Sequence, residues 1–263
     1  MRKSILLICL ILSGFVFSQE MENSNIKCNY LTAFLIDTTD VNTRKEELTG
    51  LWIGKNTSIF KSDQKAKYDS LTRESTKKSM LNPIGGKIVL DFSNIPKAYF
   101  NPEVYKVGNS VKIFDKILGT YYEYESDQNI NWTLIDETKT ISTYQCRKAV
   151  GKYRNKNITA WYTEEVPVSE GPYAFKGLPG LVIEAYDDKN FFHFTLVRLK
   201  NSNELIAPIR NTISTDYQRF SKKRSDFQND PIGPYVMQTG RQVPKDQIER
   251  VTKLHKSKNN HLD

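Results

Sequence analysis

Hydrophobic and polar positions alternate with a period of two along most of the chain, and Gly, Asn, Asp and Pro fall between the alternating runs. This pattern is typical of half-buried β-strands separated by turns. Because parallel strands need long crossovers, the short connections favour antiparallel pairing. The predicted strands cover residues 26–37, 47–53, 58–61, 112–117, 120–125, 132–136, 145–153, 158–163, 181–186 and 191–199.

Three further segments have the pattern of helices. A polar helix is predicted from Ser62 or Asp63 to about residue 80, and a second over 215–228, where aromatic residues recur at helical spacing. A third, thin and basic helix begins near Pro244. The whole pattern predicts a mainly β (α+β) fold, with a curved antiparallel sheet or half-barrel and a few surface helices.

The first 18 residues have the three-part layout of a secretory signal peptide. Arg2 and Lys3 precede an apolar run, and the compact residues Val16 and Ser18 come just before Gln19, where we expect cleavage. No later segment reaches the roughly 20 apolar residues of a membrane-spanning helix. We therefore expect an exported protein, periplasmic or associated with the outer membrane or cell surface, with no transmembrane anchor.

Length and charge limit the domain organisation and the partners. Residues 19–206 are predicted to form one β-rich domain, and residues 207–263 a basic helical extension. The formal charge is +8 and becomes +6 once Arg2 and Lys3 are removed. This moderate excess is scattered among acidic residues, so it favours anionic surfaces in general and not nucleic acid.

The segment Gly177-Leu178-Pro179-Gly180-Leu181 predicts a tight corner. Proline fixes φ at its own position, and a following glycine with positive φ would complete a type II turn. Two interpretations remain open: a rigid corner that serves folding alone, or the lip of a binding site.

With this corner, the chain resembles the GLPGLI family of exported bacterial proteins. The resemblance extends over about residues 26–199, with Val182 in place of the isoleucine of the family name. The matching pieces are Ser58-Ile59-Phe60, Trp132, Tyr144-Gln145-Cys146-Arg147-Lys148-Ala149, Ala160-Trp161-Tyr162-Thr163, Gly171-Pro172-Tyr173 and Gly177-Leu178-Pro179-Gly180-Leu181.

The resemblance implies export in Bacteroidota and a β-rich domain, and it implies no established activity. The layout of strands and turns is also similar to periplasmic lipoprotein-carrier folds, in which a curved sheet surrounds an apolar cavity. This second likeness concerns the fold and says little about function.

Few residues are candidates for chemistry. Cys28 and Cys146 remain after signal cleavage; we expect them to form a disulfide, with two free buried thiols as the alternative. His193 is the one histidine outside the polar tail, and no metal or other cofactor is predicted. A hydrolase acting on peptide or glycan is an alternative function, and it would use the carboxylates near the corner: Glu164, Glu165, Glu170 and Glu184.

The leading hypothesis is a non-enzymatic protein of the cell envelope that binds an apolar ligand or an extended segment of a partner. A third possibility is a structural partner of an outer-membrane complex, tethered by the helix that begins at Pro244. The predicted binding surface consists of Trp132, Trp161, Tyr162, Tyr173, Phe175, Leu178, Pro179 and Leu181.

Overall fold

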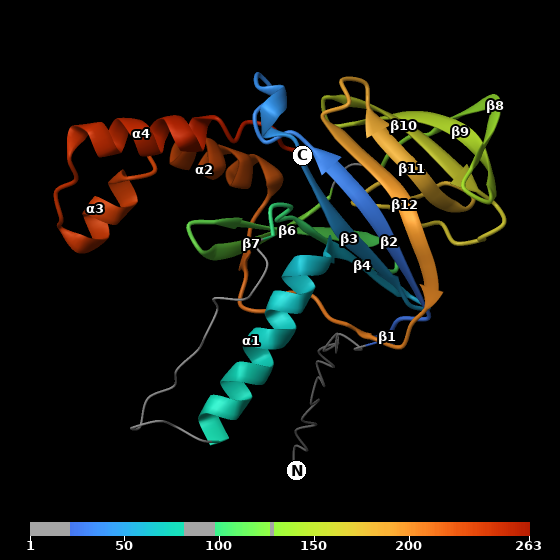
Figure 1. The fold of residues 1–263 in the computed structure, drawn as a ribbon, viewed down its shortest axis with the longest axis horizontal. Coiled ribbons are helices and arrows are strands. Elements are labelled where there is room, and N and C mark those ends of the chain that lie inside the picture. Colours follow the sequence, from blue (N-terminus) through green and yellow to red (C-terminus); the bar gives the residue numbers. More distant parts are fainter. Residues whose placement is uncertain (1–21, 82–97, 127–128) are drawn as a thin grey trace, which may run out of the picture.

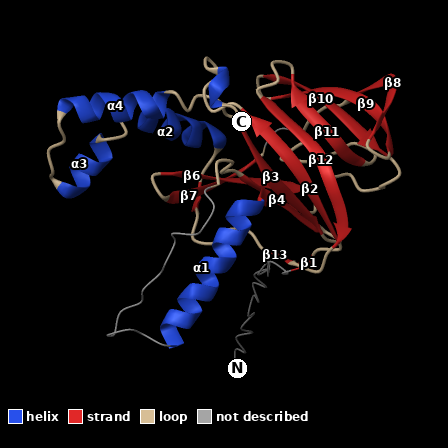
Figure 2. Ribbon diagram, in the orientation of Figure 1, coloured by secondary structure: helices blue, strands red, loops and turns tan. Residues whose placement is uncertain are grey.

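The computed structural model of this 263-residue chain describes residues 22–81, 98–126 and 129–263. A single twelve-stranded sheet dominates this part of the chain (Figures 1 and 2). The sheet is curved and open, and it does not close into a barrel. Its strand order is β14-β7-β6-β5-β4-β3-β2-β12-β11-β10-β9-β8, and all neighbours are antiparallel except β14 and β7.

The strands alternate with short turns, as the pattern of the sequence predicts. Their bounds are β2 Ile26–Phe34, β3 Lys45–Ile53, β4 Thr57–Ser62, β5 Glu103–Val107, β6 Ser110–Ile117, β7 Thr120–Glu125, β8 Thr133–Ile141, β9 Tyr144–Tyr153, β10 Lys156–Thr163, β11 Leu181–Asp187, β12 Phe192–Asn201 and β14 Ile213–Ser214. A separate pair, β1 Glu22–Asn23 and β13 Leu205–Ile206, lies beside the sheet.

One face of the sheet, called the inner face here, holds the main hydrophobic core. Side chains that are opposite one another on neighbouring strands share a face, so the strand register shows how the core is built. A row of buried, directly paired residues crosses six strands from β2 to β7: Cys28, Leu51, Phe60, Val104, Ile113 and Tyr124. The period-two alternation in each strand places these residues on the same side.

The helices are α1 Asp63–Leu81, α2 Tyr217–Asn229, α3 Gly233–Thr239 and α4 Lys245–Lys256, with a 3-10 turn at Val41–Thr43. The Ser62 hydroxyl accepts a hydrogen bond from the Lys65 amide (3.2 Å) at the start of α1, and Asp216 caps α2 through the Arg219 amide (2.8 Å). Helices α2 to α4 form an arm that projects beyond β6 and β7, on the opposite side of the molecule from β8 (Figure 1).

These observations confirm the predicted fold class. Several elements are additions to the predicted ones: the strands β1, β5, β13 and β14, the helix α3 and the 3-10 turn. The predicted signal peptide, residues 1–18, lies outside the described residues. No helix within the described ranges combines the length and the hydropathy of a membrane-spanning segment.

The C-terminal residues contribute to the same core as the sheet. Phe220 of α2 and Leu262 of the tail are almost completely buried against inner-face residues. Phe220 stacks on Tyr124 with ring centroids 4.9 Å apart. The parts of the chain before and after residue 206 thus share one hydrophobic cluster. The division into two domains at residue 206 stays a prediction.

Candidate binding surface

The corner between β10 and β11, residues 164–180, folds back over the inner face and fills it. Tyr173, Phe175 and Leu178 are each 1% exposed. Phe175 makes edge-on ring contacts with Tyr153 (5.9 Å between centroids) and Phe194 (5.8 Å). Such packed aromatic pairs stabilise a core beyond the effect of their burial. The chain's own side chains thus take the place that a ligand would have on this face.

The residues predicted to bind a ligand are therefore divided among several environments. Tyr162 and Leu181 are buried with the corner, whereas Pro179 is exposed at its tip. Trp132 is half-buried, and its Nε1 donates a hydrogen bond to the Lys176 carbonyl (2.8 Å). The structure does not bring the eight residues together on one accessible surface.

Trp161 lies on the other face of the sheet. Its cross-strand partners are Lys148 on β9 and Glu184 on β11. The ammonium group of Lys139 is 4.4 Å from the centroid of the indole and that of Lys148 is 5.6 Å from it. These two lysines cover the ring, so Trp161 is 4% exposed.

A buried ion pair anchors the corner. Glu170 contacts the ammonium group of Lys176, receives a hydrogen bond from Lys106 (2.8 Å) and accepts another from the Ser58 hydroxyl (2.9 Å). Burial alone would raise the pKa of Glu170, but Lys176 and Lys106 outweigh it and lower this pKa below its ordinary value. Glu170 is therefore ionised at neutral pH. Its contacts with Ser58 of β4 and Lys106 of β5 hold the corner against these two strands.

The backbone of the corner corrects the predicted type II turn. Gly180 does not have a positive φ; the glycine that does is Gly177, at +95°. Gly180 is required for a different reason, because a Cβ there would lie 2.0 Å from the carbonyl oxygen of Thr163. Gly171 permits a second close approach, because a Cβ there would lie 2.2 Å from the carbonyl oxygen of Phe175.

Cys28 and Cys146 are free, buried thiols, so the predicted disulfide is not formed in the structure. Cys28 is on β2 and Cys146 on β9, and the strands β12, β11 and β10 separate them in the sheet. A disulfide needs Cα atoms about 4.4–6.8 Å apart. Burial raises the pKa of Cys28 to about 12 and that of Cys146 to about 11. Neither thiol is a ready nucleophile.

The four carboxylates near the corner all have partners. Glu170 is occupied as described, and Glu184 accepts hydrogen bonds from His193 (2.9 Å) and Lys139 (2.6 Å). The hydrogen bond from His193 lowers the pKa of Glu184, partial burial opposes it, and Lys139 lowers it further. A glycosidase needs a carboxylic acid with a raised pKa. Glu170 and Glu184 have the opposite shift, so the geometry does not favour the hydrolase alternative.

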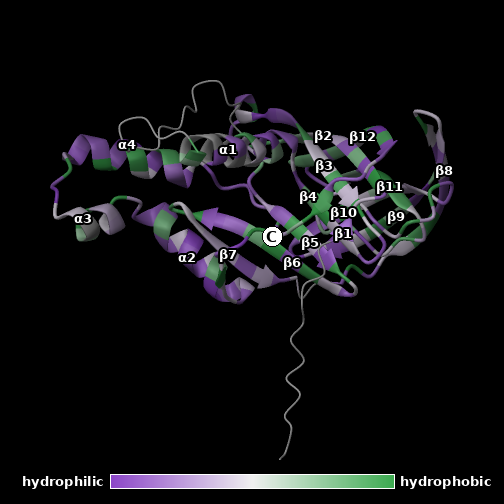
Figure 3. Cartoon of the chain, turned by 90° about the horizontal axis from the view of Figure 1, so that it is seen from below, coloured by the Kyte–Doolittle hydropathy of each residue, from purple (hydrophilic) through white to green (hydrophobic). Residues whose placement is uncertain are grey.

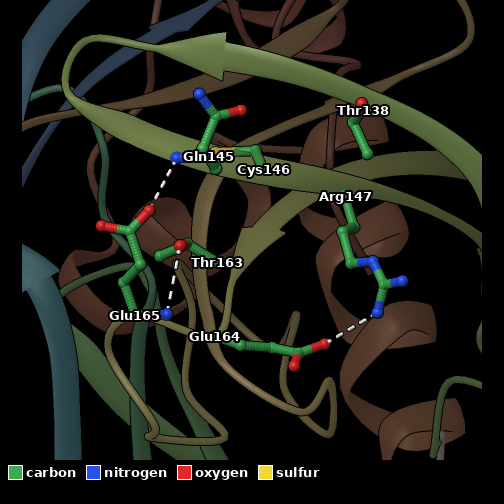
Figure 4. Close-up of a pocket in the computed structure, with 7 residues that line it drawn as sticks. All are labelled: Thr138, Gln145, Cys146, Arg147, Thr163, Glu164 and Glu165. Atoms are coloured by element: carbon green, nitrogen blue, oxygen red, sulfur yellow. Dashed lines mark hydrogen bonds and ion pairs between the residues drawn. The ribbon is translucent and has the colours of Figure 1, made fainter.

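Glu164 and Glu165 line a shallow depression of about 290 Å³ at one end of β9 and β10. Figure 4 shows Glu164 directed toward Arg147 and Glu165 directed toward the backbone of Gln145. The two distances are 3.2 Å between Arg147 Nη1 and Glu164 Oε1, and 2.8 Å between the Gln145 amide and Glu165 Oε1. Thr138 of β8 completes the wall nearest the edge of the sheet.

The strand β8 is the most accessible part of the sheet. β9 pairs with it on one side, and no strand among the described residues pairs with it on the other. Residues 133–138 are all exposed, and the side chain of Leu134 is 55% exposed. The register shifts between Ile135 and Thr138, so no β9 residue lies directly opposite Asp136 or Glu137 in the strand pairing. An unpaired edge of this kind is a template for another strand.

Within the described ranges, no three His, Cys, Asp or Glu side chains come close enough to hold a metal ion.

The sequence-based interpretation missed Lys176 and the length of β8. Lys176 lies between two matching family pieces, and Ser58 and Trp132, which belong to such pieces, both contact it. The matching pieces are far apart in the sequence, and a shared contact at Lys176 is one reason why they would belong to the same pattern.

Comparisons with known proteins agree with the importance of the corner. The profile of a family described as "Protein of unknown function (Porph_ging)" matches residues 152–184, which include β10, the corner and the start of β11. No curated protein matches the sequence. Two solved structures of PNGF-II, in space groups P21 and C2, are similar at 14% identity with TM-scores of 0.45 and 0.46. Each match covers 76% of this chain and 32% of the PNGF-II chain.

Proposed function

We propose that this protein is a non-enzymatic binding protein of the cell envelope, and that an extended segment of a partner protein adds to β8 as a further strand. The observation that carries this proposal is the unpaired, exposed edge of β8. Main-chain hydrogen bonds give affinity in this mode of recognition, and alternate side chains give specificity. The signal-like residues 1–18 support a location outside the cytoplasm.

The side chains of β8 offer contacts on both faces of an added strand. Leu134 shares a face with its partner Ala149, and Ile135 shares the opposite face with Lys148. In a bound segment, the residues that point to one face of the sheet would contact Leu134. The residues that point to the other face would contact Ile135. The shift at Asp136 and Glu137 limits regular pairing to the stretches 133–135 and 138–141, and this protects the edge against indiscriminate association.

An apolar small molecule is a weaker occupant for this protein. The inner face would have to release Tyr173, Phe175 and Leu178 before it could admit such a ligand. Displacing them would expose large buried apolar side chains to water, which is costly. The edge of β8 needs no such rearrangement.

A display library of random linear peptides, selected on the chain from Gln19 onward, tests the proposal. We expect selected peptides to bind with a Kd that increases at least about tenfold in Leu134→Glu, because a charge replaces an apolar contact. The matched control is Leu48→Glu, since Leu48 is also exposed (45%) but lies on the interior strand β3. Equal effects of both variants, or no selectable peptide, would overturn the proposal.

A further inference from the structure

The arm formed by α2, α3 and α4 carries a second surface, distant from β8. It projects from the sheet beyond β6 and β7 (Figure 1). Residues 241–258, which include α4, contain six Lys or Arg residues and two acidic ones. All six basic side chains are exposed: Arg241, Lys245, Arg250, Lys253, Lys256 and Lys258. The excess of positive charge is thus concentrated at the surface of a protruding element.

The apolar residues of α4 are used in two ways. Ile248, Val251 and His255 are half-buried on the side that faces the rest of the arm, and His255 packs edge-on against Phe227 of α2 with ring centroids 4.8 Å apart. Hydrophobic and hydrophilic stretches alternate along α4 in Figure 3. The docking of α4 onto α2 therefore accounts for the half-buried apolar residues of α4, Ile248 and Val251.

Other apolar side chains of the arm remain in contact with solvent. Met237 of α3 is 90% exposed and Leu254 of α4 is 56% exposed. Leu254 has Arg250 four residues before it on α4, at the spacing of helical neighbours. Exposed apolar residues among lysines and arginines are the combination by which peripheral proteins bind the interface of an anionic bilayer.

From this combination we infer that the arm docks onto an anionic lipid surface. The basic residues 241–258 face the lipid phosphates, and Met237 and Leu254 enter the region between headgroups and acyl chains. The positive charge suits any anionic surface, and the exposed apolar side chains of Met237 and Leu254 are what favour a lipid surface over an acidic protein or a polysaccharide. The surface lies on the opposite side of the molecule from β8, so β8 would stay accessible to a partner while the arm is bound.

Co-sedimentation with lipid vesicles tests this inference, using the chain from Gln19 onward, which contains every described residue and lacks the apolar signal. We expect binding to vesicles that contain phosphatidylglycerol and no binding to vesicles of phosphatidylcholine alone. The double variant Arg250→Glu, Lys253→Glu should lower the partition coefficient about tenfold or more. Met237→Glu should lower it by a smaller factor, and circular dichroism checks that each variant is folded.

The matched control is the double variant Lys55→Glu, Lys200→Glu, which changes the net charge equally at exposed positions outside the arm. It should leave the partition coefficient within about twofold. Three results would each overturn the inference: equal binding to neutral vesicles, an equal loss in the control variant, or binding to dextran sulfate without binding to phosphatidylglycerol vesicles.

Discussion

The corner and the edge strand are two regions of the same sheet with opposite properties. The corner, residues 164–180, is dense in aromatic residues and matches the family profile, yet most of it is buried against the inner face. β8 has little aromatic character and falls outside the profile match, yet no strand in the described part of the chain pairs with its outer edge. The difference teaches that the segment with the most distinctive sequence packs into the core, whereas the backbone groups open to a further strand lie in a segment with little distinctive sequence.

The largest expected effect concerns the ion pair under the corner. Lys176→Met leaves the carboxylate of Glu170 buried with one cation fewer, and we expect the free energy of unfolding to fall by about 3–5 kcal/mol. Urea denaturation measures this change. In the double variant Glu170→Gln, Lys176→Met, more than half of the loss should be recovered, because no uncompensated charge remains.

Lys148→Met is the matched control for that change. Lys148 also forms an ion pair, 2.7 Å long, with Glu137, but the side chain of Glu137 is half exposed. A loss of less than about 1 kcal/mol is expected. If Lys176→Met and Lys148→Met have the same small effect, the corner is not anchored by its buried charges and the contrast with β8 is lost.

Packing of the corner on the inner face gives the next effect. Leu178→Ala should lower the free energy of unfolding by about 2–5 kcal/mol, because a cavity forms where Leu178 is now 1% exposed. Thermal or urea unfolding measures it. A change below about 1 kcal/mol would mean that the inner face is loosely filled and open to an apolar ligand.

The docking of the C-terminal tail on the inner face, at Asp115 of β6 and Tyr124 of β7, predicts a dependence of stability on pH. Burial and then the nearby carboxylate of Asp263 raise the pKa of Asp115 to about 6, whereas burial and Arg224 lower the pKa of His261 to about 4. Unfolded values are about 3.9 and 6.5. As pH rises from 4 to 6, folded Asp115 retains a proton that the unfolded chain releases, so its contribution to stability falls.

His261 acts in the reverse direction, because the unfolded chain retains a proton that the folded one has released. The two contributions, each about 3 kcal/mol, therefore oppose each other in the wild type. Stability of Asp115→Asn should rise with pH across this range, and stability of His261→Gln should fall. Urea denaturation at a series of pH values measures both slopes. Parallel slopes in the two variants would contradict the assignment, and peptide binding at β8 should be the same in both.

The smallest effect on stability is expected at the edge strand. Leu134→Glu should change the free energy of unfolding by no more than about 0.5 kcal/mol, because the side chain is exposed. The same variant should weaken peptide binding, as described above. A large loss of stability would show that Leu134 is part of the folded core, and binding data on this variant would then say nothing about the edge.

The sequence predicts most of the sheet because alternation and turn residues are local signals. It predicts ten strands near their observed positions. It misses β5, a five-residue strand, and the two-residue strands β1, β13 and β14, all of them too short for the alternation to be distinctive. The alternation predicts that β8 ends at residue 136, which is too early. Asp136 and Glu137 interrupt the alternation where the register shifts.

Other properties depend on contacts that the sequence does not contain. Aromatic density at Tyr173 and Phe175 is compatible with a binding surface or a core, and only the path of the corner over the inner face decides between them. The pairing of Cys28 and Cys146 depends on how many strands separate them. Gly180 can be recognised as a special position from sequence, but its role depends on the approach of the Thr163 carbonyl.

Amide hydrogen exchange with and without a saturating selected peptide tests the central claim most directly. Binding at the edge predicts slower exchange in β8, Thr133–Ile141, with unchanged exchange in residues 173–181 of the corner. Protection of the corner and inner-face strands, with β8 unaffected, would contradict the account and assign recognition to the interior of the sheet.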